Sequence, residues 1–178
     1  QGTIENTLQK ALAQAEINKL EILKRLKLSD WAQSDETGIR VDGENWQLWT
    51  WCNNWCSLYV ADKSRGYCVI EENFGNDYQG ILVHDCFSAQ NKTVAKAHQH
   101  CLAHYQRDLS YCIEFEQCTW SKDLSRFLKR ATTIRDKIWQ QNFDPELRQQ
   151  VINSFSKSLM AKLQTPPSIK NKYAYRMY

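Results

Sequence analysis

Apolar residues recur every three or four positions through the first 28 residues, which is the spacing of one helix face. Lys and Glu fill the positions between them, so the pattern predicts an amphipathic helix over residues 4–28. Ser29-Asp30 ends the helix. The apolar face consists of Ile4, Leu8, Leu12, Ala15, Leu20, Leu23 and Leu26.

The pattern then alternates with a period of two, which is typical of strands. Strands are predicted over residues 31–41, 46–52 and 55–61. Asp42-Gly43 and Asn53-Asn54 supply the turns between them, because these residues tolerate the positive φ of tight hairpins. Three strands joined by tight turns form an antiparallel meander, which needs a covering layer on its apolar face. The tryptophans of the second and third strands are predicted to face that core.

A crossover follows the meander. Residues 67–74 read as a short helix closed by Gly75, and residues 81–85 form a short apolar run typical of a strand buried on both faces. A right-handed crossover would lay this strand beside an earlier one. Another helical stretch, a short strand around residues 95–101 and a helix over residues 102–109 come next.

Beyond Trp120 the pattern is helical throughout. Asp144-Pro145 begins a helix that Thr165-Pro166-Pro167 ends, and the basic, Tyr-rich tail 170–178 is given no partner. The predicted class is therefore α/β, with a mixed sheet and a helical extension. The predicted divisions are an N-terminal helix, a central core and a helical extension with a basic tail, over residues 1–30, 31–120 and 121–178.

Charge is distributed unevenly along the chain, although the net charge is only +3. Residues 122–178 contain 12 Lys and Arg against 4 Asp and Glu. Two interpretations stay open: a polyanionic partner such as DNA, or a solvated helical surface. The basic residues at helical spacing, which would contact DNA phosphates in the first interpretation, are Lys122, Arg126, Lys129 and Arg130.

Seven cysteines contain no C-x-x-C pair, and no secretory signal or membrane-spanning run is present, which predicts a cytoplasmic protein. Cys101 and His104, with Cys86, His98 and His100 nearby, have the side chains that zinc prefers. A closed zinc site needs a second pair at suitable spacing, so no structural zinc is expected. The other interpretation is a buried thiol and a hydrogen-bonded imidazole at a helix start.

Two carboxylates are the strongest candidates for chemistry. Asp35 lies inside the first predicted strand, and Asp85 directly follows the buried strand. If the crossover sets these strands side by side, both side chains enter one pocket and provide oxygen ligands for hard divalent cations. The alternative role for each is a cap or a turn former.

Several blocks of this sequence, taken in order, resemble the insertion-sequence-sixty-six family of bacterial transposases. The resemblance extends from about residue 2 to residue 109. Its motifs are Asp35–Gly43, the Trp-rich segment Asn45–Trp49, Ser64–Gly66, Gln79–Ala89 and His100–Leu109.

The resemblance implies a DDE transposase with a ribonuclease-H-like fold and a C-terminal helical insertion. It implies that Asp35 and Asp85 bind two Mg²⁺ or Mn²⁺ ions, and that the protein cuts and joins transposon-end DNA as a homo-oligomer when complete. Under this interpretation, Cys101 and His104 form the pocket wall, and Arg107 contacts DNA phosphate.

The sequence departs from the family at the third carboxylate, a Glu in an Asn-Asn-x-x-Glu-Arg block. Here Gln164–Ser168 resembles the approach to that block, but residues 169–178 do not contain it, and Glu146, the last Glu, begins a helix elsewhere. We therefore expect a truncated transposase core that is inactive alone. The alternative is a non-catalytic DNA-binding or assembly remnant. Another ribonuclease-H-like nuclease is disfavoured by the Trp-rich strand and the C-x-x-H block.

Overall fold

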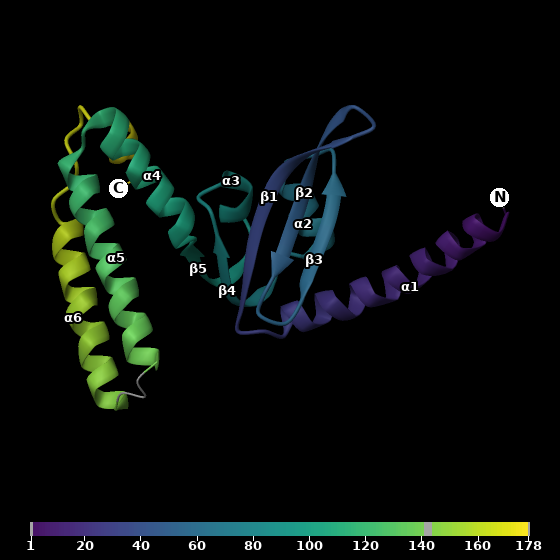
Figure 1. The fold of residues 1–178 in the computed structure, drawn as a ribbon, viewed down its shortest axis with the longest axis horizontal. Coiled ribbons are helices and arrows are strands. Elements are labelled where there is room, and N and C mark those ends of the chain that lie inside the picture. The colour runs from purple at the N-terminus through teal and green to yellow at the C-terminus, as the bar shows by residue number, and fades with distance from the viewer. Residues whose placement is uncertain (1, 141–143, 178) are drawn as a thin grey trace. The chain divides into compact units, whose positions relative to one another are not determined.

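The computed structural model describes residues 2–140 and 144–177, which fall into two compact units, residues 1–101 and 102–178 (Figure 1). The first unit holds the sheet. Its element order is α1 (Gly2–Lys27), β1 (Trp31–Val41), β2 (Glu44–Cys52), β3 (Ser57–Asp62), α2 (Tyr67–Asn73), β4 (Tyr78–His84), α3 (Ser88–Asn91) and β5 (Ala95–His100).

One mixed sheet with strand order β3-β2-β1-β4-β5 organises the described part of the first unit. The three hairpin-connected strands pair antiparallel, as the alternating pattern predicts. β4 then returns beside β1 and runs parallel to it, and β5 runs parallel to β4. The predicted crossover is confirmed, and so is a mixed α/β fold.

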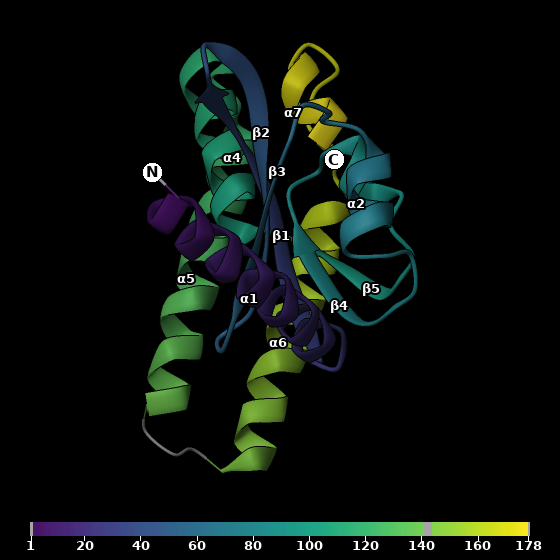
Figure 2. The ribbon, with the colours of Figure 1, turned by 90° about the vertical axis from the view of Figure 1, so that its right-hand side faces the viewer.

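One face of the sheet carries the core. Trp49 and Trp51 stack with ring centroids 6.1 Å apart, and Phe74 stacks on Trp51 at 5.7 Å. The end of α1, together with α2 and α3, covers this face. Leu26, Ile70, Leu82 and Ala89 join the same buried cluster. Figure 1 and Figure 2 show α1 leaving the sheet, with only its end beside the strands.

The predicted helix at the start of the chain is confirmed, but most of its apolar face is not covered. Ile4, Leu8 and Leu12 are each more than half exposed, and burial begins only at Ile22 and Leu23. The physical reason is length: 26 residues span about 39 Å, more than the sheet can cover. Only the last turns of α1 pack on the core.

The Asp42-Gly43 turn adopts the required backbone, whereas neither Asn53 nor Asn54 has the predicted positive φ. Asp42 and Gly43 have φ values of 50° and 80°, and Gly75 has φ of 88° after α2. Trp55 departs from the expectation that these tryptophans face the core, because it lies in the turn between β2 and β3 and is 89% exposed. Asn53 determines that turn: its side-chain oxygen accepts the backbone N–H of Trp55 and of Cys56.

Over its described residues, the regular elements of the second unit are all helices. It contains α4 (Leu102–Glu116), α5 (Thr119–Gln140), α6 (Pro145–Leu163) and α7 (Lys172–Met177). Asp144 caps α6 by accepting the Glu146 N–H, as the Asp-Pro signal predicts. Phe127 of α5 lies 5.4 Å from Phe155 of α6, ring to ring, within an apolar seam between the two helices.

The C-terminal tail has a partner that the sequence pattern does not reveal. Glu116, at the end of α4, accepts the backbone N–H groups of Tyr173 and Ala174, and its own carbonyl accepts the Asn171 side chain. Ala174 is fully buried beside Cys112 and Cys118. These contacts are long-range, so no local pattern could indicate them.

The stacked core makes a direct prediction. Replacing Trp51 with Ala removes a fully buried ring and should lower the free energy of unfolding by about 3–5 kcal/mol. Trp55→Ala, the matched change at an exposed tryptophan, should shift it by less than about 0.5 kcal/mol. Urea unfolding of both variants measures the difference, and equal effects would contradict the placement of the core.

Candidate functional site

Asp35 lies in β1, and Asp85 directly follows β4, the strand that pairs parallel with β1. The β1–β4 ladder pairs Trp31 with Ile81 and Gln33 with Val83. Two positions beyond the Gln33–Val83 pair, the same register sets Asp35 opposite Asp85, which lies one residue after β4 ends. Neighbouring strands lie about 4.8 Å apart. The register thus brings these two predicted residues to equivalent positions on adjacent strands.

Side-chain alternation puts both aspartates on the face opposite the core. Ala32 and Ser34 of β1 are buried, as are Leu82 and His84 of β4. The residues between them point the other way, since successive strand side chains alternate. Asp35 and Asp85 fall in this second set and are half-buried.

Each aspartate is oriented by a local hydrogen bond to one carboxylate oxygen. Asp35 Oδ1 accepts the Glu36 N–H at 3.0 Å, and Asp85 Oδ1 accepts the Phe87 N–H at 3.0 Å. Within the part of the chain that the structure describes, the second oxygen of each has no hydrogen bond. Each side chain therefore keeps an oxygen available to bind a cation.

Glu36 follows Asp35 directly but belongs to the other face. Its side chain is 2% exposed and pairs with Arg65, which contacts Glu36 Oε1 through Nε at 3.0 Å and Nη2 at 2.6 Å. Because alternation separates it from Asp35, Glu36 does not replace the third carboxylate.

The negative charge of Asp35 affects the Cys52 thiol on the neighbouring strand β2. Cys52 of β2 pairs with Gln33, and Thr50 pairs with Asp35, so the Cys52 thiol and the Asp35 carboxylate share one face. Burial raises the pKa of the Cys52 thiol, and the negative charges of Asp35 and then Cys56 raise it further. A nearby carboxylate disfavours the thiolate.

Behind Asp85, on the core face, lies a group of imidazoles. His84 is fully buried, and its Nδ1 donates to the Asp85 carbonyl, which can only accept. His84 Nε2 therefore accepts from His98 Nδ1 at 2.8 Å. Burial lowers the pKa of His84, which favours the neutral imidazole, although its bond to the Asp85 carbonyl opposes this. These contacts fix the backbone that carries Asp85.

The residues of the C-x-x-H block separate between the two units. Cys101 ends the first unit, where its N–H donates to the His84 carbonyl at 2.6 Å. His104 and Arg107 lie on α4 of the second unit, three residues apart and hence on one helix face. His104 Nδ1 is buried without a hydrogen bond from the described residues, and Arg107 is exposed.

The four basic residues predicted to contact phosphate all lie on α5. Each is exposed, and their spacing places them along one side of the helix. Arg126 also forms an ion pair with Asp123 at 3.3 Å. The four are Lys122, Arg126, Lys129 and Arg130.

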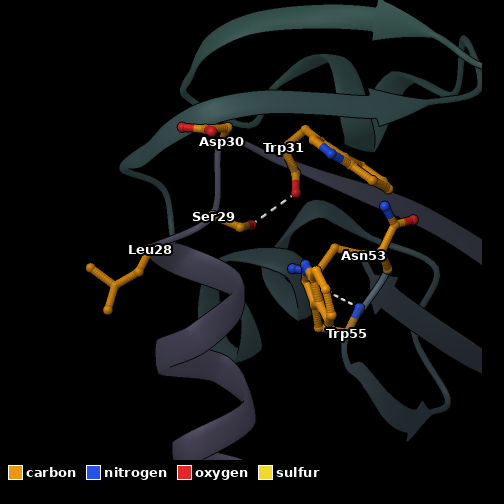
Figure 3. Close-up of a pocket in the computed structure, with 7 residues that line it drawn as sticks. Leu28, Ser29, Asp30, Trp31, Asn53 and Trp55 are labelled. Atoms are coloured by element: carbon orange, nitrogen blue, oxygen red, sulfur yellow. Dashed lines mark hydrogen bonds between the residues drawn. The ribbon is translucent and has the colours of Figure 1, made fainter. Parts of the chain in front are cut away.

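A separate polar pocket of about 230 Å³ lies where α1 meets β1, at the beginning of that strand (Figure 3). The indoles of Trp31 and Trp55 and the side chain of Asn53 border it. Asp35 and Asp85 are not among its lining residues.

Among the described residues, no three His, Cys, Asp or Glu side chains converge in a way that could hold a metal ion. A cation held by Asp35 and Asp85 would therefore have no third His, Cys, Asp or Glu ligand among the described residues.

A family model described as "Transposase IS66 family" matches residues 1–174. The chain belongs to this family. No curated protein and no solved structure matches it. Over the described residues, no helix of this family member is long and apolar enough to cross a membrane. Transposases act on DNA, and DDE transposases generally use divalent metal ions.

Two contributors to this region do not emerge from the sequence patterns. Glu36 stands out only as part of a motif, and the contact between Arg65 and Glu36 joins positions 29 residues apart. The signal that could have found Glu36 is the alternation itself, which turns a charged residue toward the core and therefore requires a cationic partner.

The shared face of Asp35 and Cys52 can be tested by chemistry. Asp35→Asn removes one negative charge and should lower the Cys52 pKa, although burial will keep it above the ordinary value. Iodoacetamide labelling of Cys52, followed by mass spectrometry across pH, should shift to lower pH.

The matched control is Asp42→Asn in the hairpin turn of the same strand, where Asn tolerates the positive φ of 50°. This variant should leave the Cys52 profile unchanged. Identical shifts in both variants would show that the effect is not due to the proximity of Asp35.

Proposed function

We propose that this chain carries the catalytic core of a transposase, in which Asp35 and Asp85 bind divalent cations for cleavage and joining of transposon-end DNA. The observation that supports the proposal most is the parallel β1–β4 ladder, whose last pair, Gln33 with Val83, lies two residues before each aspartate. Membership of the transposase family supplies the substrate class.

The donor set fits Mg²⁺ or Mn²⁺. Both are hard cations that prefer carboxylate oxygens and retain several waters, so two aspartates can hold them together with substrate phosphates. When bound, such ions activate the attacking oxygen and stabilise the leaving oxygen of a phosphodiester.

The chain's own residues provide orientation. The backbone N–H groups of Glu36 and Phe87 hold one oxygen of each aspartate, and the other oxygen accepts no hydrogen bond from the described residues. The exposed cations of α5 and Arg107 on α4 are suited to phosphate contacts, which give affinity without sequence preference. Cys101, the last residue of the first unit, is proposed to support the pocket wall.

A ribonuclease-H-like fold is part of the same proposal. The strand order β3-β2-β1-β4-β5 supports it, with the first aspartate on β1 and the second immediately after β4.

A non-catalytic DNA-binding or assembly role is the second candidate. It is favoured by one observation: no group of three His, Cys, Asp or Glu side chains that could hold a metal ion forms among the described residues. The two candidates share the fold and the basic helix and differ only in strand cleavage.

Asp35→Asn and Asp85→Asn should each abolish Mn²⁺-dependent cleavage of transposon-end DNA, because each removes a charged oxygen ligand. Cleavage is measured on labelled duplex with the protein that contains this chain, and circular dichroism should be unchanged. Asp42→Asn, on the same strand but in the distal turn, should cleave normally.

Cleavage retained by either site variant would reject that residue as a ligand. If the unaltered protein binds DNA but never cleaves it, the non-catalytic role is correct.

The basic side of α5 makes an independent prediction. Replacing Lys122, Arg126 and Lys129 with Gln should flatten the dependence of DNA affinity on salt, by about 0.9 in the log–log slope for each phosphate that the protein no longer neutralises. Fluorescence anisotropy at several salt concentrations measures the slope.

A matched triple variant in α1, with Gln at Lys10, Lys19 and Lys24, removes the same charge elsewhere and should leave the slope nearly unchanged. Equal flattening by both triples would mean that net charge, not the α5 surface, governs binding.

A further inference from the structure

Arg65 occupies a turn whose backbone is fixed from both sides. It lies between β3 and α2, in the Ser64-Arg65-Gly66 segment. The Ser64 carbonyl accepts the indole N–H of the buried Trp49 at 3.1 Å, and the Ser64 hydroxyl accepts the Gly66 N–H at 2.9 Å. The base of the Arg65 side chain is thereby anchored to the core of the sheet.

The guanidinium of Arg65 pairs with the Glu36 carboxylate, whose negative charge has little other compensation. It contacts Glu36 Oε1 through two nitrogens, at 3.0 and 2.6 Å, and the Glu36 side chain is 2% exposed. Glu36 Oε2 is buried and has no hydrogen bond from any described residue. Removing the cation would leave the Glu36 charge buried and uncompensated, so replacing Arg65 alone should destabilise the protein more than breaking an ordinary surface ion pair.

The same guanidinium also holds the loop after β4. Its central carbon lies 4.4 Å from the centroid of the Phe87 ring, within the range of a cation–π interaction. Arg65 therefore bridges β1 and the β4–α3 loop, two segments that are far apart in the sequence.

Both ends of this bridge reach an aspartate. The Glu36 N–H donates to Asp35 Oδ1, and the Phe87 N–H donates to Asp85 Oδ1, each at 3.0 Å. The contacts form one continuous series from one carboxylate to the other: Asp35, Glu36, Arg65, Phe87 and Asp85.

We propose that Arg65 is a positioning residue that sets the relative placement of Asp35 and Asp85 from the opposite face of the sheet, through Glu36 on one side and Phe87 on the other. The proposal rests on the proposed function, because it assigns the two aspartates to one cation site. Arg65 does not touch the cation or the DNA in this role. Partners of metal ligands commonly affect metal affinity by about 10- to 100-fold.

The experiment uses Mn²⁺ as a paramagnetic probe. In the unaltered protein, Mn²⁺ should broaden the backbone amide NMR signals of Glu36 and Phe87 together, at the same concentration, since each amide donates to one of the two ligands. Arg65→Gln should raise the Mn²⁺ concentration required by about tenfold or more and separate the two responses. Arg65→Lys keeps the charge but loses the two-nitrogen contact. The Mn²⁺ concentration that it requires should therefore lie between those of the unaltered protein and Arg65→Gln.

Two further variants distinguish positioning from stability. Phe87→Leu keeps apolar volume but removes the ring face, and should weaken Mn²⁺ binding by a smaller factor than Arg65→Gln does. Glu36→Gln combined with Arg65→Gln removes the buried unpaired charge, so it should restore the stability that Arg65→Gln removes without restoring Mn²⁺ affinity. Arg40→Gln is the control, because Arg40 lies on the same strand, is exposed and bonds only to Asn45 among described residues.

The outcomes separate the two proposals. No broadening at either amide in the unaltered protein would contradict the metal site itself, and the positioning role with it. Normal broadening that Arg65→Gln leaves unchanged would overturn the role of Arg65 alone. Recovery of Mn²⁺ affinity in the double Gln variant would also overturn it, since Arg65 would then act only through stability.

Discussion

The parallel pairing of β1 with β4 is the constraint on which the candidate site depends. Without it, Asp35 and Asp85 are two carboxylates in a chain that offers many. The ladder covers only Trp31–Gln33 against Ile81–Val83, yet it determines which residues beyond it become neighbours. A shift of one residue would send one aspartate to the core face, because side chains alternate along a strand.

The packing of the core face explains why this register is specified. Ala32 is fully buried on β1 and Leu82 on β4, and the Trp49–Trp51–Phe74 stack covers the adjacent strands. A slipped register would expose these side chains and bury Gln33 or Asp35. The apolar layer on one face thus fixes the chemistry on the other. Arg65 is proposed to add a second, polar link between the same two segments.

Much of the fold could be predicted from local patterns. Local backbone preference or periodicity is enough to predict three features: the Asp42-Gly43 turn, the Asp144 cap and the apolar strand before Asp85. The aspartates could be proposed because both lie at strand positions near a predicted crossover. The resemblance to a transposase family then gave them a role, and the family match confirms the family.

What could not be predicted depends on long-range contacts. The tail helix is held by Glu116, more than 50 residues away, and Arg65 meets Glu36 across 29 positions. The exposed apolar face of α1 was not predicted either, because periodicity shows that a face is apolar but not what covers it. These failures have one cause: a local sequence pattern does not show which distant residues a segment contacts.

The most direct measurement is the anomalous scattering of manganese in crystals of this protein soaked with Mn²⁺. A shared cation predicts a peak within about 2–2.5 Å of a carboxylate oxygen from both Asp35 and Asp85. A peak bound to one aspartate alone, or located away from both, would contradict the claim that these side chains form one site.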